Sequence, residues 1–198
     1  MNYLAHAYLS FDQPEILVGN MISDFVKGKK KFYFSAGIQS GITLHREIDS
    51  FTDQHPAIKN VKEIFRPAYR LYSGAIIDVL FDHFLAIDEN EFTEKKLEHF
   101  TKTTYDTLGH YTHLFPEKFG MMFPYMKSQN WLYNYRHSWG IEKSLGGLVR
   151  RSKYMEESET AFRLFKENYK MLSNAYQAFF PFVKNLAINF INANTKSN

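Results

Sequence analysis

Two acidic residues and a histidine interrupt an otherwise apolar stretch of the sequence, DVLFDHFLA, residues 78–86. On a helix of about 3.6 residues per turn, Asp78 and Asp82 share one face, whereas His83 points about 100° away from Asp82. Burying a carboxylate without a partner is costly, so such groups are paired, hydrogen-bonded or bound to a metal. The stretch therefore predicts either part of a metal site or acids that are neutralised by arginines.

Other segments carry residues of the same ligand type. His45 and Asp49 share a helical face in GITLHREIDSFTD, although Asp49 could instead pair with Arg46. His6 in NYLAHAYL and Asp24 in GNMISDFVKG also lie among apolar neighbours, where a core histidine or a hydrogen-bonded acid is the ordinary alternative. Because four apolar segments each contribute Asp or His, a shared metal centre is favoured. Imidazole and carboxylate together suit Mn, Fe, Zn or Mg.

The composition is that of a folded protein with bulky packing. The 198 residues are 44% hydrophobic and include 19 Phe and 13 Tyr, which is too apolar for disorder. The absence of cysteine excludes disulfides, zinc-thiolate sites and a cysteine nucleophile. A net charge of +3 is well short of a dedicated nucleic-acid binder. Without a signal sequence or a long apolar run, we expect a cytoplasmic protein that inserts into no membrane.

Helix signals dominate and strand signals are almost absent, so we predict an all-α fold. It should form one helical bundle over residues 1–198, with a polar tail from about 194. The pattern predicts that Asp24 lies on a helix that ends near Gly28 and that Ser35 caps the helix carrying His45. Prolines should kink or interrupt the later helices. The predicted helices are at about 14–28, 35–53, 56–65, 73–86, 97–108 and 158–193, with short turns at 115–126.

Four motifs in succession, MNYLAHAYLS, GNMISDFVKG, GITLHREIDSFTD and DVLFDHFLA, resemble those of the acyl carrier protein phosphodiesterase family. The match is looser at QNWLYNYR and GGLVRR in the second half. The resemblance implies a bundle related to the HD-domain phosphohydrolases with a rearranged motif order. It also implies hydrolysis of the phosphodiester that joins 4'-phosphopantetheine to a serine of holo-acyl carrier protein, with Mn as the expected cofactor and Mg or Fe as alternatives.

The site residues follow from this resemblance together with the chemistry of each side chain. A divalent ion activates water and withdraws charge from a phosphoryl oxygen. Asp49 and Asp78 would orient the ligands or accept a proton, and Arg46 would clamp the phosphate unless it pairs with a neighbouring acid. The expected metal ligands are His6, Asp24, His45, Asp82 and His83.

The expected partner is acyl carrier protein, an acidic substrate that would dock on a basic surface. Two basic clusters qualify, Lys27–Lys31 and Arg150–Lys153. Two other functions remain open. An HD-like hydrolase of a nucleotide or another small phosphate ester would keep the metal site without the docking surface, and a non-catalytic helical binding protein would need neither.

Overall fold

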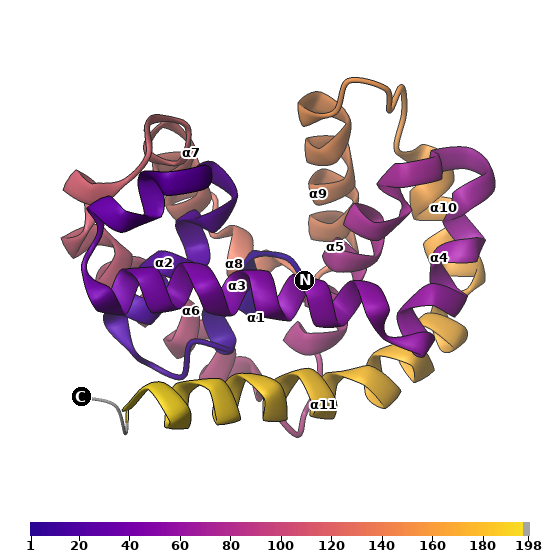
Figure 1. Cartoon of the computed structure of the whole chain (residues 1–198). Helices are drawn as coiled ribbons and strands as arrows, with labels where there is room; N and C mark the ends of the chain where they lie inside the picture. Colours follow the sequence, from indigo (N-terminus) through magenta and orange to yellow (C-terminus); the bar gives the residue numbers. More distant parts are fainter. Residues whose placement is uncertain (196–198) are drawn as a thin grey trace.

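The computed structural model describes residues 1–195, and within this range every regular element is a helix (Figure 1). The all-α prediction is confirmed. The described part of the chain also forms four short 3-10 helices, η1 (Ser23–Phe25), η2 (Gly28–Tyr33), η3 (Arg70–Tyr72) and η4 (Thr112–Leu114). The α-helices are α1 (Tyr3–Tyr8), α2 (Pro14–Ile22), α3 (Ala36–Gln54), α4 (Pro56–Tyr69), α5 (Ser73–Ala86), α6 (Glu94–His110), α7 (Glu117–Ser128), α8 (Trp131–Asn134), α9 (Ser138–Arg151), α10 (Glu159–Glu167) and α11 (Tyr169–Thr195).

Helices α2 and α3 pack unusually closely because two glycines meet at their crossing. A Cβ at Gly19 would lie 2.1 Å from the carbonyl oxygen of Ile38, and a Cβ at Gly41 would lie 2.2 Å from that of Ile16. Any larger side chain would push the helices apart. This close approach brings Asn20, the residue after Gly19, into contact with the middle of α3.

Several predicted helix boundaries differ from those in the structure. The helix predicted for 14–28 ends at Ile22, so Asp24 lies in the 3-10 turn η1 rather than on α2. The predicted 158–193 helix is two helices that are separated at Asn168, and α11 continues through Pro181. The 115–126 segment contains the continuous helix α7 in place of short turns. Of the predicted polar tail, residues 196–198 lie outside the described residues.

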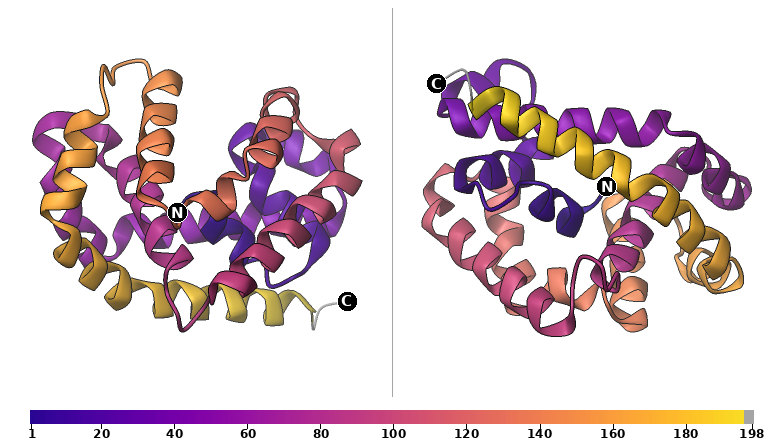
Figure 2. Two further views of the ribbon diagram at one scale, coloured as in Figure 1. Left: turned by 180° about the vertical axis from the view of Figure 1, so that it is seen from behind. Right: turned by 90° about the horizontal axis from the view of Figure 1, so that it is seen from below.

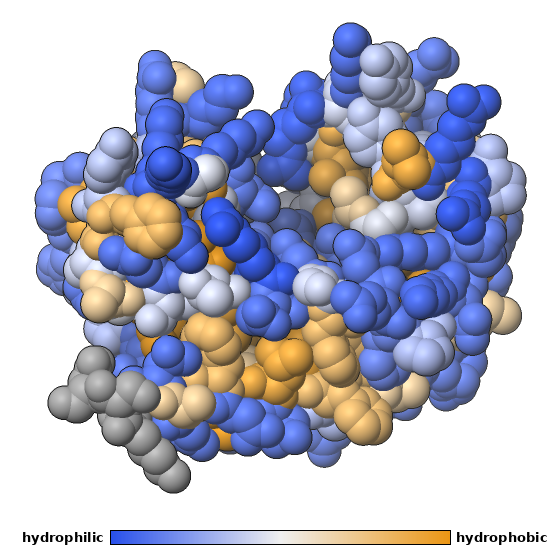
Figure 3. Space-filling model, in the orientation of Figure 1, coloured by the Kyte–Doolittle hydropathy of each residue, from blue (hydrophilic) through white to orange (hydrophobic). Residues whose placement is uncertain are grey.

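A cleft divides the upper part of the molecule. Helix α9 rises on one side of it and α7 on the other, while α3 and α11 run beneath both (Figures 1 and 2). The space-filling view shows a hollow at this place (Figure 3). The N-terminus lies near the base of the cleft, at the start of α1. The elements that carry His6, Asp49 and Asp82 therefore meet below an open approach.

Aromatic side chains fill the core beneath the cleft. Phe179 of α11 packs against Phe51 of α3 and Phe81 of α5, with ring centroids 6.0 and 5.8 Å apart. Such buried rings supply much of the apolar area that holds a helical bundle together. Within residues 1–195, no helix is long and apolar enough to cross a membrane.

Candidate metal centre

Three side chains from α1 and α3 converge below the cleft. The Nε2 atom of His6 lies 3.2 Å from Asp49 Oδ1, and the Nε2 atom of His45 lies 3.1 Å from Asp49 Oδ2. The two imidazole rings stack, with centroids 3.9 Å apart and 14° between their planes. One ligand atom from each of the three residues lies within 4.8 Å of the others. His6 and His45 are buried, whereas the Asp49 side chain is 41% exposed.

Asn20 of α2 contacts the Nδ1 atoms of both histidines. Its side-chain oxygen lies 2.8 Å from His6 Nδ1, and its backbone carbonyl oxygen lies 2.8 Å from His45 Nδ1. The Asn20 amide nitrogen donates to the carbonyl oxygen of His6 and to Ser10, which fixes the orientation of the side-chain oxygen. Both Nδ1 atoms therefore face oxygen acceptors. The Nε2 atoms face Asp49, and that of His6 also lies 3.1 Å from the Met1 carbonyl oxygen.

The protonation states of the two histidines differ. Burial and the neighbouring charge of His45 lower the pKa of His6 to about 4. Burial also opposes the charge on His45, but hydrogen bonds to Asp24 and Asp49 outweigh it and raise the pKa of His45 to about 9. Hydrogen bonds to both histidines hold the pKa of Asp49 well below its usual range in spite of burial. The cluster therefore carries one proton that a cation could replace.

Asp24 approaches the cluster from the solvent side. Its Oδ1 atom lies 3.2 Å from His45 Nε2, and its side chain is 67% exposed. The expectation of an inward-facing helical acid is wrong, since the 3-10 turn after α2 presents Asp24 to water. It is nevertheless adjacent to one of the three clustered residues.

Asp78 contacts a different group, the buried amine of Met1. That amine donates to Asp78 Oδ1 at 2.9 Å and lies 3.5 Å from Asp49 Oδ1. Burial opposes its charge, but Asp78 and Asp49 together raise the pKa of the amine to about 10. The Met1 amine therefore lies between Asp78 and the cluster of His6, His45 and Asp49, and its positive charge compensates the negative charge of Asp78.

Asp82 accepts hydrogen bonds from backbone N–H groups at the N-terminal end of α1. It is fully buried, and its Oδ2 atom accepts from the backbone N–H of Leu4 at 2.7 Å. Its Oδ1 atom accepts from the N–H groups of Asn2 and Ala5 at 3.2 Å each. These donors would otherwise be unpaired at the start of the helix. Burial outweighs the three hydrogen bonds and raises the pKa of Asp82 to about 7.

His83 points away from the cluster. Its Nδ1 atom lies 2.7 Å from the Tyr135 carbonyl oxygen, and its Nε2 atom lies 3.3 Å from the Tyr169 hydroxyl. The structure does not bring Asp82 or His83 together with His6, His45 and Asp49. Both are satisfied by protein groups, but among the described residues Asp82 bonds to backbone N–H groups and not to the arginines expected as the alternative.

Arg46 does not pair with a neighbouring acid among the described residues. Its exposed side chain donates Nη2 to the Val26 carbonyl oxygen at 3.1 Å and so ties α3 to the segment between η1 and η2. This contact occupies part of the guanidinium that we expected to clamp a phosphate.

Asn20 and Tyr3 were not anticipated from the sequence as parts of the site, and Arg151 was expected only as part of the basic cluster Arg150–Lys153. A fully buried asparagine inside the apolar run LVGNMI was the one available signal for Asn20. A buried amide must find hydrogen-bond partners, and here the partners are the histidines. Nothing in local spacing connects Tyr3 with Arg151, because their contact joins residues 148 positions apart.

The donor set suits a divalent ion. Two imidazole nitrogens and a carboxylate oxygen are the ligands of Zn, Mn and Fe sites, and Nδ1 hydrogen bonds of the kind made by Asn20 orient histidine ligands elsewhere. Asp49, which also lies 3.5 Å from the Met1 amine, would balance part of the ion's charge. His6, His45 and Asp49 would hold the ion, with Asp24 at the solvent side.

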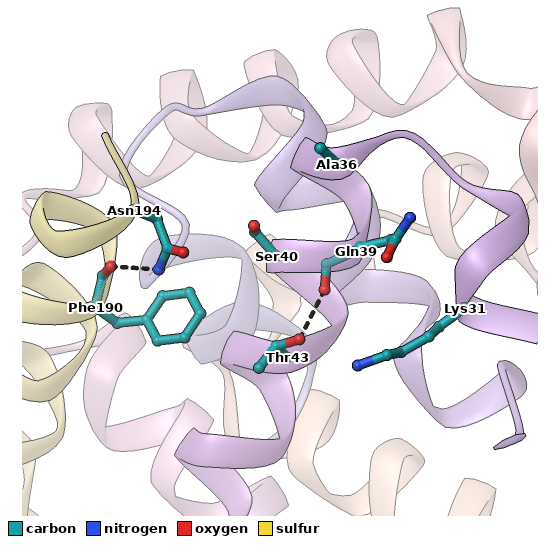
Figure 4. Close-up of a pocket in the computed structure, with 7 residues that line it drawn as sticks. All are labelled: Lys31, Ala36, Gln39, Ser40, Thr43, Phe190 and Asn194. Carbon is teal, nitrogen blue, oxygen red and sulfur yellow. Dashed lines mark hydrogen bonds between the residues drawn. The ribbon is translucent and has the colours of Figure 1, made fainter. Parts of the chain in front are cut away.

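A surface pocket lies apart from this cluster. It has a volume of about 320 Å³ and is formed by α3, α11 and Lys31 of η2 (Figure 4). Its lining includes Gln39, Thr43 and Phe190 but none of the clustered ligands. We therefore place the candidate site at the base of the cleft.

The fold and this centre define an all-helical protein with a candidate His-His-Asp metal site. Comparison with known proteins gives the family: the chain matches the acyl carrier protein phosphodiesterase family over residues 1–183 and belongs to it. The protein named acyl carrier protein phosphodiesterase from Yersinia pestis is 31% identical over 183 residues, which cover 91% of this chain and 94% of that protein. The protein of the same name from Photorhabdus laumondii is 28% identical over 193 residues, 96% of each chain. No solved structure gives a significant match.

Proposed function

We propose that this protein is a metal-dependent phosphodiesterase that hydrolyses the bond between 4'-phosphopantetheine and the serine of holo-acyl carrier protein. The products would be apo-acyl carrier protein and 4'-phosphopantetheine. The single observation that carries the metal dependence is the cluster of His6, His45 and Asp49, whose Nε2 and carboxylate atoms converge in a buried setting. The proposed substrate is supported by family membership, since the relatives from Yersinia pestis and Photorhabdus laumondii are named for this activity.

In this proposal, different residues bind the ion, orient its ligands and accept a proton. When bound, a divalent ion such as Mn would withdraw charge from a phosphoryl oxygen and make water a better nucleophile. Asn20 would keep both imidazole rings aligned. Asp78, which is partly exposed and shares the Met1 amine with Asp49, would accept the proton of the attacking water. Asp24 would hold the solvent side of the centre.

The open cleft supports a macromolecular substrate. The clustered carboxylates reach solvent, with Asp49 41% and Asp24 67% exposed. A phosphopantetheine arm that projects from a folded carrier protein can enter such an opening while the carrier stays outside. A cytoplasmic location, in which holo-carrier is available, remains a prediction.

The direct test is a mass spectrum of holo-acyl carrier protein after incubation with the purified protein and Mn. We expect a loss of mass that corresponds to phosphopantetheine, and we expect a chelator to prevent it. His45→Ala should abolish the change, whereas His99→Ala, at an exposed position on α6, should not. Hydrolysis of nucleotides or small diesters without turnover of the carrier would replace this proposal with a small-ester hydrolase. Absence of turnover on either substrate would leave a binding protein.

A further inference from the structure

Arg151, the last residue of α9, reaches across the cleft to α1. Its Nη1 atom donates to the Tyr3 hydroxyl at 3.5 Å. The Tyr3 hydroxyl in turn donates to the Met122 sulfur of α7 at 3.6 Å. Tyr3 begins the short helix that carries His6. A guanidinium from α9 therefore contacts the element that supplies a ligand of the candidate centre.

This guanidinium has no acidic partner among residues 1–195. Arg163 pairs with Glu167 one turn away on α10, and Arg136, between α8 and α9, pairs with Glu94. For Arg151 the contact described is the neutral phenol of Tyr3, at a distance typical of a weak hydrogen bond. Most of its five N–H donors remain available to a ligand.

Tyr3, which contacts Arg151, lies three residues before His6 on α1, so the two side chains share one side of this helix. Burial raises the pKa of Tyr3, the guanidinium of Arg151 lowers it, and the carboxylate of Asp24 raises it. The Tyr3 phenol therefore lies within the field of both charged groups. Asp24 also contacts His45, so its carboxylate acts on both Tyr3 and the cluster.

We propose that Arg151 binds the phosphoryl oxygens of the substrate and that Tyr3 positions its guanidinium. The proposal deepens the function proposed above and rests on it for the identity of the substrate. A planar guanidinium presents paired N–H donors that match two oxygens of a phosphate, a geometry that lysine lacks. Arg46, which we expected in this role from the sequence, is instead bonded to the backbone of Val26. The neutral phenol orients Arg151 without neutralising it.

Binding of inorganic phosphate in the presence of Mg²⁺, measured by calorimetry, tests this without requiring turnover. Arg151→Ala should weaken phosphate binding about 10- to 100-fold, because a charge-assisted pair of hydrogen bonds is lost. Arg151→Lys should recover only part of the affinity. Arg150→Ala is the matched control, since it removes the adjacent exposed arginine of the same helix end and should change the affinity less than about twofold.

Steady-state kinetics with holo-acyl carrier protein provide a second test of the role of Arg151. Arg151→Ala should lower kcat/KM about 10-fold or more, and Tyr3→Phe should lower it less while thermal unfolding of both variants stays near that of the wild type. Equal phosphate affinity in the wild type and Arg151→Ala, or no binding by the wild type, would overturn the proposal. Phosphate binding through Arg151 without any hydrolysis of holo-carrier would support it and refute the proposed function instead.

Discussion

The rings of His6 and His45 stack 3.9 Å apart although they come from different helices, α1 and α3. A stacked arrangement of two imidazole rings requires other groups that fix the orientation of both rings. Asn20 does so with one side-chain oxygen and one backbone oxygen, each 2.8 Å from an Nδ1 atom. The close crossing of α2 and α3 at Gly19 and Gly41 allows Asn20 to reach both.

Replacing Asn20 by alanine should weaken divalent-ion binding about 10- to 100-fold, because the residue orients both histidine ligands without contacting the ion. Calorimetric titration with Mn or Zn measures the effect. The exposed Asn60→Ala in α4 is the control and should leave the affinity unchanged. If Asn20→Ala folds and binds the ion as tightly as the wild type, the orienting role assigned to Asn20 is wrong.

Replacing Asp82 by alanine should destabilise the protein by about 3 kcal/mol or more, because the buried N–H groups of Asn2, Leu4 and Ala5 lose their acceptor. Activity should fall as a consequence, since α1 carries His6. Urea unfolding gives the free energy of unfolding, and ion titration of the folded fraction separates the two roles. A variant with wild-type stability but no ion binding would indicate that Asp82 is a metal ligand after all.

The buried carboxyl of Asp82 should also make stability depend on pH. Its pKa in the folded protein is about 7, above the value of 3.8 expected without burial, so the folded state holds the proton more tightly. The stability that this group contributes is fully present below about pH 4 and is lost as the pH rises through about 7.

Urea unfolding of the wild type and of Asp82→Asn between pH 4 and 8 checks this sign. The asparagine does not titrate, so its free energy of unfolding should fall less over that range. Parallel curves for the two proteins would show that the Asp82 pKa is unshifted.

The exposed lysines of η2, together with Lys27 just before it, should attract an acidic carrier protein toward the cleft. They follow directly after η1, which presents Asp24, and the exposed rings of Phe32 and Tyr33 lie beside them. Neutralising three of them should raise KM for holo-carrier about 3- to 10-fold and leave kcat nearly unchanged, because they would contact the carrier rather than the reacting phosphorus. The three substitutions are Lys27→Gln, Lys29→Gln and Lys30→Gln.

A triple variant of equal charge on the opposite lobe controls for net charge. Lys59, Lys166 and Lys170 are exposed on α4, α10 and the start of α11, and changing them to Gln should have little effect on KM. Added salt should raise KM of the wild type toward that of the η2 variant. If both triple variants respond alike, η2 is not the docking face, and the Arg150–Lys153 cluster becomes the better choice.

The sequence by itself determined the all-α fold, most helix positions and the pool of acids and histidines. Periodicity of apolar residues identifies a helix, and ligand-type residues on that periodic face are visible in one dimension. It could also place His45 and Asp49 on one face, as the structure does. These features depend on neighbours within about two helical turns, so local spacing is sufficient.

Only the tertiary structure decided which members of the pool meet. Asp82 has the spacing of a ligand, yet its acceptors are used by N–H groups 77 to 80 residues away in the sequence. Asn20 and Arg151 acquire their positions from the crossing of α2 with α3 and from the reach of α9 across the cleft. A buried polar group takes whichever partner the packing brings within about 3 Å, and that choice is made between helices rather than along one of them.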